Sequence, residues 1–107
     1  MTDHWTELEL LDEPSDDEVL GARAGDRALV AVRHQGAWRV FADRCTHAEC
    51  AFTDYAEVVA EDGVIVCNCH GAEFRLADGS VALEPAEIPL TLLEVRERDD
   101  RLEVRLD

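Results

Sequence analysis

The sequence has no long hydrophobic run and no recognisable leader. None of its apolar stretches approaches the roughly 18 residues that indicate a transmembrane helix. The first residues, Met1 to His4, also lack the basic region and apolar stretch of a secretory signal. We therefore expect neither a signal peptide nor a membrane anchor, and we expect a cytoplasmic protein.

Basic residues are scarce. The chain has 10 Lys and Arg against 25 Asp and Glu, for a formal net charge of -15. Because phosphate backbones are bound by basic surfaces, nucleic acid is excluded as the expected partner. The acidic surplus either serves solubility alone or also steers the protein towards a basic patch on another protein, and both effects can operate together.

Several kinds of catalytic or binding motif are also missing. The sequence contains no glycine-rich nucleotide loop and no separate mononuclear iron site of two His and a carboxylate. It has no internal repeat, low-complexity tract or linker, and 47% of its 107 residues are hydrophobic, which is enough for one core. We expect a single domain, residues 1–107, that is not an enzyme by itself.

Short strands fill much of the chain, and they predict an all-β fold. Alternating or continuous apolar segments bounded by turn residues indicate strands. These segments are residues 5–10, 18–24, 28–33, 38–42, 64–67, 73–76, 90–97 and 101–106. Turn signals at 34–36, 61–63, 77–79 and 98–100 separate several of them. Segments 16–25 and 53–60 each also allow a helical turn, so their structure stays open.

Two segments place Cys and His close together, namely Cys45-Thr46-His47 and Cys67-Asn68-Cys69-His70. An iron-sulfur centre with two thiolates on one iron and two imidazoles on the other needs this composition. The candidate ligands are therefore Cys45, His47, Cys67 and His70. Structural zinc is the alternative, although zinc fingers usually pair like ligands and each segment here mixes them. A Cys/His protease would not explain the duplicated pairs.

These two segments resemble the ligand loops of the Rieske family of [2Fe-2S] proteins. The patterns are C-x-H-x-x-C at residues 45–50 and C-x-C-H-G at residues 67–71. The similarity extends to Phe74, to the turn at 77–79, to Pro85-Ala86 in the loop that covers the cluster in this family, and to residues 90–106. It thus spans nearly the whole chain and is greatest to the soluble Rieske ferredoxins.

The resemblance implies a Rieske-type antiparallel β-sandwich with a small cluster-binding subdomain at about residues 43–87, raised on a base that both chain ends build. It also implies a [2Fe-2S] cluster on the four candidate ligands. Some Rieske proteins join their two ligand loops by a disulfide at the positions of Cys50 and Cys69, so the resemblance implies that bridge here. Two buried thiols are the alternative.

Two positions depart from the high-potential members of the family. Those members usually have a Ser directly after the His-Gly pair and a Tyr two residues further on, and both hydroxyls donate to cluster sulfurs. Ala72 and Phe74 stand there in this chain, and neither side chain can donate a hydrogen bond. We therefore expect a reduction potential below zero, near the bottom of the Rieske range of about -150 to +300 mV. Gly71 is expected to allow a tight backbone path beside the cluster.

The function that the resemblance implies is one-electron transfer. The chain would accept electrons from a flavin-dependent reductase and pass them to a terminal oxygenase of the aromatic-ring-hydroxylating type, with His47 and His70 at the exit. Such a carrier is expected to be a monomer. The alternative is a tightly bound subunit of a larger redox enzyme, similar to the small subunit of nitrite reductases.

The two remaining histidines and three of the aromatic residues are expected to have structural roles. His4 and His34 have no cysteine nearby, and a position near the chain end and at a hairpin tip explains them, so we do not expect them to be ligands. Trp5, Trp38 and Phe41 lie in predicted strands and are expected in the core.

Overall fold

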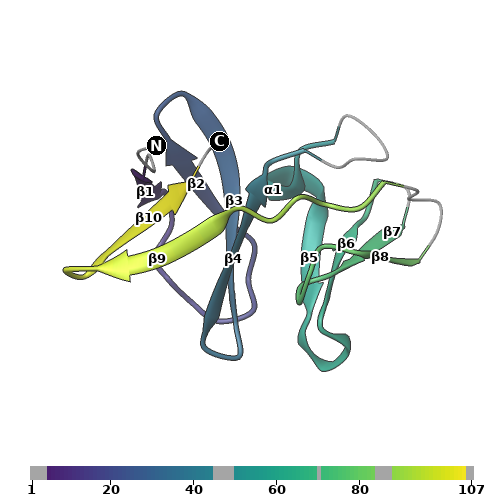
Figure 1. Cartoon of the computed structure of the whole chain (residues 1–107). Helices are drawn as coiled ribbons and strands as arrows, with labels where there is room; N and C mark the ends of the chain where they lie inside the picture. The colour runs from purple at the N-terminus through teal and green to yellow at the C-terminus, as the bar shows by residue number, and fades with distance from the viewer. Residues whose placement is uncertain (1–4, 45–49, 70, 84–87, 106–107) are drawn as a thin grey trace.

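The computed structural model describes residues 5–44, 50–69, 71–83 and 88–105. In these residues the chain forms two antiparallel sheets, one of six strands and one of four. Figure 1 shows the sheets side by side, with the four-stranded sheet on the right. The predicted all-β fold is confirmed.

The six-stranded sheet is built from the two ends of the chain. Its strands are β1 (Trp5–Leu10), β2 (Leu20–Ala24), β3 (Arg27–His34), β4 (Ala37–Ala42), β9 (Glu94–Arg98) and β10 (Arg101–Arg105). They lie in the order β4-β3-β2-β1-β10-β9. The two edge strands meet where the Leu93 N–H donates to the Val40 carbonyl at 2.7 Å. The sheet therefore curls into a partly closed barrel.

The four-stranded sheet comes from the chain between β4 and β9. Helix α1 (Phe52–Tyr55) leads into β5 (Ala56–Val59), and the 3₁₀ helix η1 (Ala60–Asp62), β6 (Val64–Cys67), β7 (Ala72–Arg75) and β8 (Val81–Leu83) follow. The strands are neighbours in chain order. The limits of the subdomain, about 43 and 87, stay a prediction. No helix in the described ranges is both long enough and apolar enough to cross a membrane.

Strand β3 is buried on both faces and contributes to two cores. Val30 and Val32 face the smaller sheet, whereas Leu29 and Ala31, on the opposite face of the pleat, pack within the larger sheet. The core between the sheets also contains Phe41, Phe52, Ile65, Cys67, Ala72, Phe74, Leu76 and Leu90. This contact holds the smaller sheet against β3 and β4.

Strand β2 begins at Leu20, two residues later than predicted, and the helical alternative for segment 16–25 is wrong. Asp17 has a φ of +57°, in the left-handed region that neither a strand nor an α-helix uses. Its N–H donates to the Arg33 carbonyl at 2.8 Å, so this segment packs against the end of β3 instead of extending β2.

The smaller sheet contains two strands that sequence patterns did not predict, β5 and β8. The helical turn that segment 53–60 allows is present as α1, which ends at Tyr55, and β5 follows. The predicted strand 90–97 begins only at Glu94. Leu90 is instead buried in the core between the sheets, where its N–H donates to the Gly79 carbonyl at 2.8 Å. Pairing with distant residues decides these segments, and local patterns do not encode it.

Gly79 sits at a tight crossing between the β7–β8 turn and the segment before β9. Its φ is +80°, and a Cβ atom placed there would lie 2.3 Å from the Leu90 carbonyl oxygen. The Gly79 N–H donates to the Arg75 carbonyl at 2.7 Å. In the same turn, hydrogen bonds from Ser80 lower the pKa of the exposed Asp78.

We expect Gly79→Ala to destabilise the protein far more than Gly25→Ala. Gly25 has a φ of +59°, but no atom lies within 4 Å of the position that a Cβ would take there, so the control measures left-handed strain alone, about 1 to 2 kcal/mol. At Gly79 the clash with Leu90 adds about 1 to 3 kcal/mol. Denaturant unfolding of both variants measures the difference, and equal losses would contradict the close approach.

Candidate metal centre

Of the four candidate ligands, Cys67 lies in the described part of the chain. Cys45, His47 and His70 lie outside the described residues. Among the residues that are described, no group of three His, Cys, Asp or Glu side chains gathers that could hold a metal ion. The ligand assignment therefore stays a prediction, and the structure informs it through the residues that flank the two ligand segments.

Cys67 is the last residue of β6 and is 1% exposed. It pairs in register with Ala56 on one side and with Ala72 on the other, and it belongs to the core between the sheets. The Gly71 N–H donates to the Cys67 carbonyl at 2.8 Å, and Gly71 has a φ of +81°. The backbone at Gly71 thus makes the expected tight turn between β6 and β7, and its position beside the cluster stays a prediction.

A disulfide between Cys50 and Cys69 joins the two ligand segments. This is the bridge that the family resemblance implies. Since Cys50 ends the first segment and Cys69 lies within the second, the bond brings residues 19 positions apart to the same end of the smaller sheet. In the chain-entropy treatment, closing a loop of this size stabilises the fold by about 3 kcal/mol.

The Asp43 side chain links the two ends of the first ligand segment. Its carboxylate accepts the Thr53 N–H at 2.9 Å and the Thr53 hydroxyl at 2.7 Å. The two residues flank the segment, one just after β4 and the other in α1. The second segment is tied to the same helix, because the Asn68 N–H donates to the Tyr55 carbonyl at 2.6 Å. No local sequence pattern pointed to Asp43, since its partner is ten residues away.

Three aromatic rings belong to the same core as Cys67, and Cys50 and Cys69 pack against this core. Phe52 stands edge-on to Phe41 at 5.3 Å and to Phe74 at 6.1 Å between ring centroids. Phe74 and Ala72 are both 0% exposed on the inner face of β7. The surroundings of Cys67 are thus apolar, and neither of these two β7 residues carries a hydroxyl. The Pro85-Ala86 pair of the expected covering loop lies outside the described residues.

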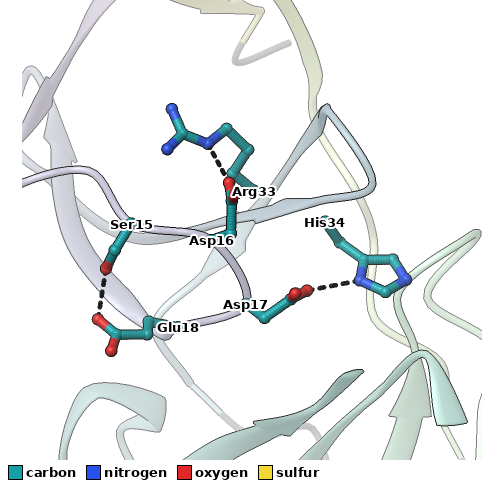
Figure 2. A network of polar contacts seen from close by, with 6 residues as sticks. All are labelled: Ser15, Asp16, Asp17, Glu18, Arg33 and His34. Atoms are coloured by element: carbon teal, nitrogen blue, oxygen red, sulfur yellow. Dashed lines mark hydrogen bonds and ion pairs between the residues drawn. The ribbon is translucent and has the colours of Figure 1, made fainter. Parts of the chain in front are cut away.

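His34 is more buried than a hairpin tip suggests. Its side chain is 13% exposed, and its Nδ1–H donates to the Asp17 carboxylate at 2.6 Å. Figure 2 shows this pair beside the ion pair of Arg33 with Asp16 and the hydrogen bond from Ser15 to Glu18. His34 lies at the β3–β4 hairpin, as expected from the sequence, and it is partly buried because residues 15–18 fold back onto the end of β3. The other histidine with a structural interpretation, His4, lies outside the described residues.

The three aromatic residues expected in the core have different environments. Trp38 and Phe41 are buried, as expected. Trp5 is only half-buried, and the Arg96 guanidinium lies over its ring at 4.1 Å. The core assignment of Trp5 is wrong because its ring packs against Arg96 and belongs to neither core cluster.

Comparison with protein families finds a match to the Rieske [2Fe-2S] domain over residues 4–94. Curated relatives include cytochrome b6-f complex iron-sulfur subunit 1 of Synechocystis sp. (strain ATCC 27184 / PCC 6803 / Kazusa), which is 32% identical over 95 residues. Subunit 2 of Nostoc sp. (strain PCC 7120 / SAG 25.82 / UTEX 2576) is 34% identical over 95 residues. The matches cover 87% and 78% of the chain and 51% of each relative. The chain spans about half the length of the curated relatives it matches.

Solved structures of similar fold include two ferredoxins. The ferredoxin of carbazole 1,9a-dioxygenase from Nocardioides aromaticivorans IC177 has a TM-score of 0.83 at 18% identity, over 96% of this chain and 98% of that one. The Sphingomonas yanoikuyae B1 ferredoxin has a TM-score of 0.83 at 23% identity, over 97% and 100% of the two chains. At these identities the likeness concerns the fold, and it confirms the predicted Rieske-type β-sandwich.

We expect Asp43→Ala to remove the link between the two ends of the first ligand segment. Two hydrogen bonds from Thr53 would be lost, which should cost about 1 to 3 kcal/mol of stability and speed the loss of iron. Asp54→Ala is the matched control, because Asp54 is an exposed carboxylate one residue further along α1. Thermal unfolding and iron content after incubation with a chelator measure both effects. Equal behaviour of the two variants would contradict this role of Asp43.

Proposed function

The chain belongs to the Rieske [2Fe-2S] domain family, and on this premise we propose that it carries single electrons from a flavin-dependent reductase to a terminal oxygenase. The observation that supports this proposal most is the end-to-end match with ferredoxins of nearly the same length. A further similar structure is named as a complex of reduced oxygenase and oxidised ferredoxin in carbazole 1,9a-dioxygenase. The monomeric state and cytoplasmic location of the carrier stay predictions.

The proposal assigns the cluster to the thiolates of Cys45 and Cys67 and the imidazoles of His47 and His70. A bound [2Fe-2S] cluster would supply reversible one-electron chemistry. The donor set fits such a cluster, and the described residues support the assignment. Cys67 ends β6 in an apolar setting, and the Cys50–Cys69 disulfide brings the two ligand segments together.

The chain's own residues would then hold and shield the site. Asp43 and Thr53 would keep the ends of the first segment together. Phe52 and Phe74 would exclude water from the side of Cys67 that faces the core. We propose that the two imidazoles face the partner and form the exit for the electron. The net charge of -15 supports docking on a basic surface of that partner.

A second function has its own support. The curated relatives are named as iron-sulfur subunits of the cytochrome b6-f complex, which is a larger redox assembly. A permanent redox subunit, the alternative already drawn from the sequence, therefore remains a candidate. Tagged chain from its native host would copurify with a fixed set of partners if it is a subunit, and it would elute alone if it is a carrier.

Reconstitution tests both the carrier function and the ligands. With a flavin-dependent reductase and a Rieske oxygenase, we expect the wild-type chain to support NADH-dependent product formation that slows as salt is raised. His47→Ala should lose the cluster, its visible absorption and all turnover, because metal binding and folding are coupled. His34→Gln, outside the ligand segments, should retain them. A coloured, active His47→Ala protein would refute the ligand assignment, whereas a coloured wild-type chain that transfers no electrons would refute the carrier function.

The reduction potential gives an independent test. We expect a wild-type value below zero, because Ala72 and Phe74 donate no hydrogen bond towards the cluster. Phe74→Tyr adds a hydroxyl at a fully buried position. A bond worth about 1.4 kcal/mol more in the reduced state would raise the potential by about 60 mV. Phe74→Leu controls for altered packing, and protein-film voltammetry measures all three. A clearly positive wild-type potential would contradict the expectation.

A further inference from the structure

The two edge strands of the larger sheet separate beyond their meeting point. Antiparallel pairing at Val40 and Leu93 would, if continued, join residues 37–39 of β4 to residues 94–96 of β9. Within the described residues no such ladder forms, and Figure 1 shows the two strands running apart. Instead, these residues line a groove of about 610 Å³, a volume typical of ligand sites.

On the β9 wall of the groove, several backbone groups have no strand partner among the residues that the structure describes. Strands β9 and β10 are joined by the two-residue turn 99–100, whose residues both have positive φ, so Arg98 and Arg101 form the hydrogen-bonded pair that closes the hairpin. Hydrogen-bonded residues alternate along a strand. It follows that Val95 and Glu97 direct their N–H and C=O groups to the open edge.

The β4 wall has the same character. Gln35 and Gly36 form a second two-residue turn with positive φ, and His34 pairs with Ala37. By the same alternation, Trp38 directs its backbone groups outward. Val40, two residues further along β4, also directs its backbone groups outward, and its carbonyl accepts the N–H of Leu93.

The groove is lined by the two indoles of Trp5 and Trp38 and by four charged side chains, those of Arg39, Glu94, Arg96 and Glu97. The Glu94 carboxylate is paired with Arg105 at 2.9 Å. The Nε of Arg39 is buried without a hydrogen-bond partner among the described residues. The other lining arginine, Arg96, donates to Glu103 at 2.7 Å. Because buried donors normally have acceptors, an acceptor on a bound molecule, such as a carboxylate, would complete Arg39.

We propose that this groove binds an extended peptide segment of a partner protein, which adds a strand between β4 and β9 and places a Glu or Asp carboxylate on Arg39. An extended backbone matches the alternating donors and acceptors of both walls, whereas a small carboxylate would leave them unpaired. Apolar side chains of the segment would pack on Trp5 and Trp38. The inference uses no cluster ligand, so it stands apart from the proposed electron transfer.

The location allows both activities at once. Residues 37–39 begin β4, and the first ligand segment follows the other end of that strand. A segment bound in the groove would therefore tether the chain to a partner and leave the ligand segments accessible.

Both tryptophans of the chain line the groove, so intrinsic fluorescence reports on it directly. The probe is a capped ten-residue peptide of alternating Thr and Val with Lys at each end and a central Glu, and its matched control has Gln in place of Glu. We expect saturable binding of the Glu peptide by the intact holoprotein and about tenfold weaker binding of the Gln peptide, or about 1.4 kcal/mol. Arg39→Gln protein, with its fold checked by circular dichroism, should bind the two peptides equally.

Two further probes address the backbone. Methylation of every second amide nitrogen in the Glu peptide should weaken binding at least about tenfold, because it removes strand pairing along one edge. 3-Phenylpropionate, a small aromatic carboxylate, should bind much more weakly than the peptide. The proposal is overturned if the Glu peptide does not bind, if Arg39→Gln keeps the preference for Glu, or if methylation has no effect. It is also overturned if 3-phenylpropionate binds as tightly as the peptide, since the groove would then be a small-molecule site.

Discussion

Apolar packing between the two sheets is the contact on which the rest of this structure depends. Phe41 of β4 meets Phe52 of α1, which in turn meets Phe74 of β7. Those three elements adjoin the two ligand segments at their described ends. Any loosening of this packing would therefore move the segments relative to one another, even with the Cys50–Cys69 bridge intact. Rigid support of this kind is what a metal site on loops requires.

The same apolar packing is relevant to the reduction potential expected for a Rieske cluster. A redox centre bordered by apolar side chains exchanges electrons at a potential set by charge, solvent access and nearby hydrogen bonds. Here Ala72 and Phe74 are fully buried and carry no hydroxyl that could donate a hydrogen bond. The net charge of -15 disfavours the addition of an electron. In the proposed function, the charge that disfavours reduction would also speed the encounter with a basic partner.

Local sequence predicted the elements whose patterns are self-contained. Strands β1, β3, β4, β6 and β10 appear close to their predicted limits, because alternation and turn residues within each segment specify them. Strands β5 and β8 and the late start of β9 depend on partners elsewhere in the chain. The hydrogen bonds between Asp43 and Thr53 and between His34 and Asp17 also join segments ten or more residues apart.

The sequence by itself determined the family and the chemical types of the four candidate ligands, because residue identity and short spacing carry both and need no coordinates. The Cys50–Cys69 pairing was implied by the family resemblance alone, with two free thiols as the alternative, and the structure decided it. Only the tertiary structure decided that β4 and β9 meet at Val40 and Leu93 and then part, leaving Arg39 in a groove with two indoles. The reason is physical: where a curled sheet fails to close depends on the packing of all its strands together, and no single strand encodes that gap.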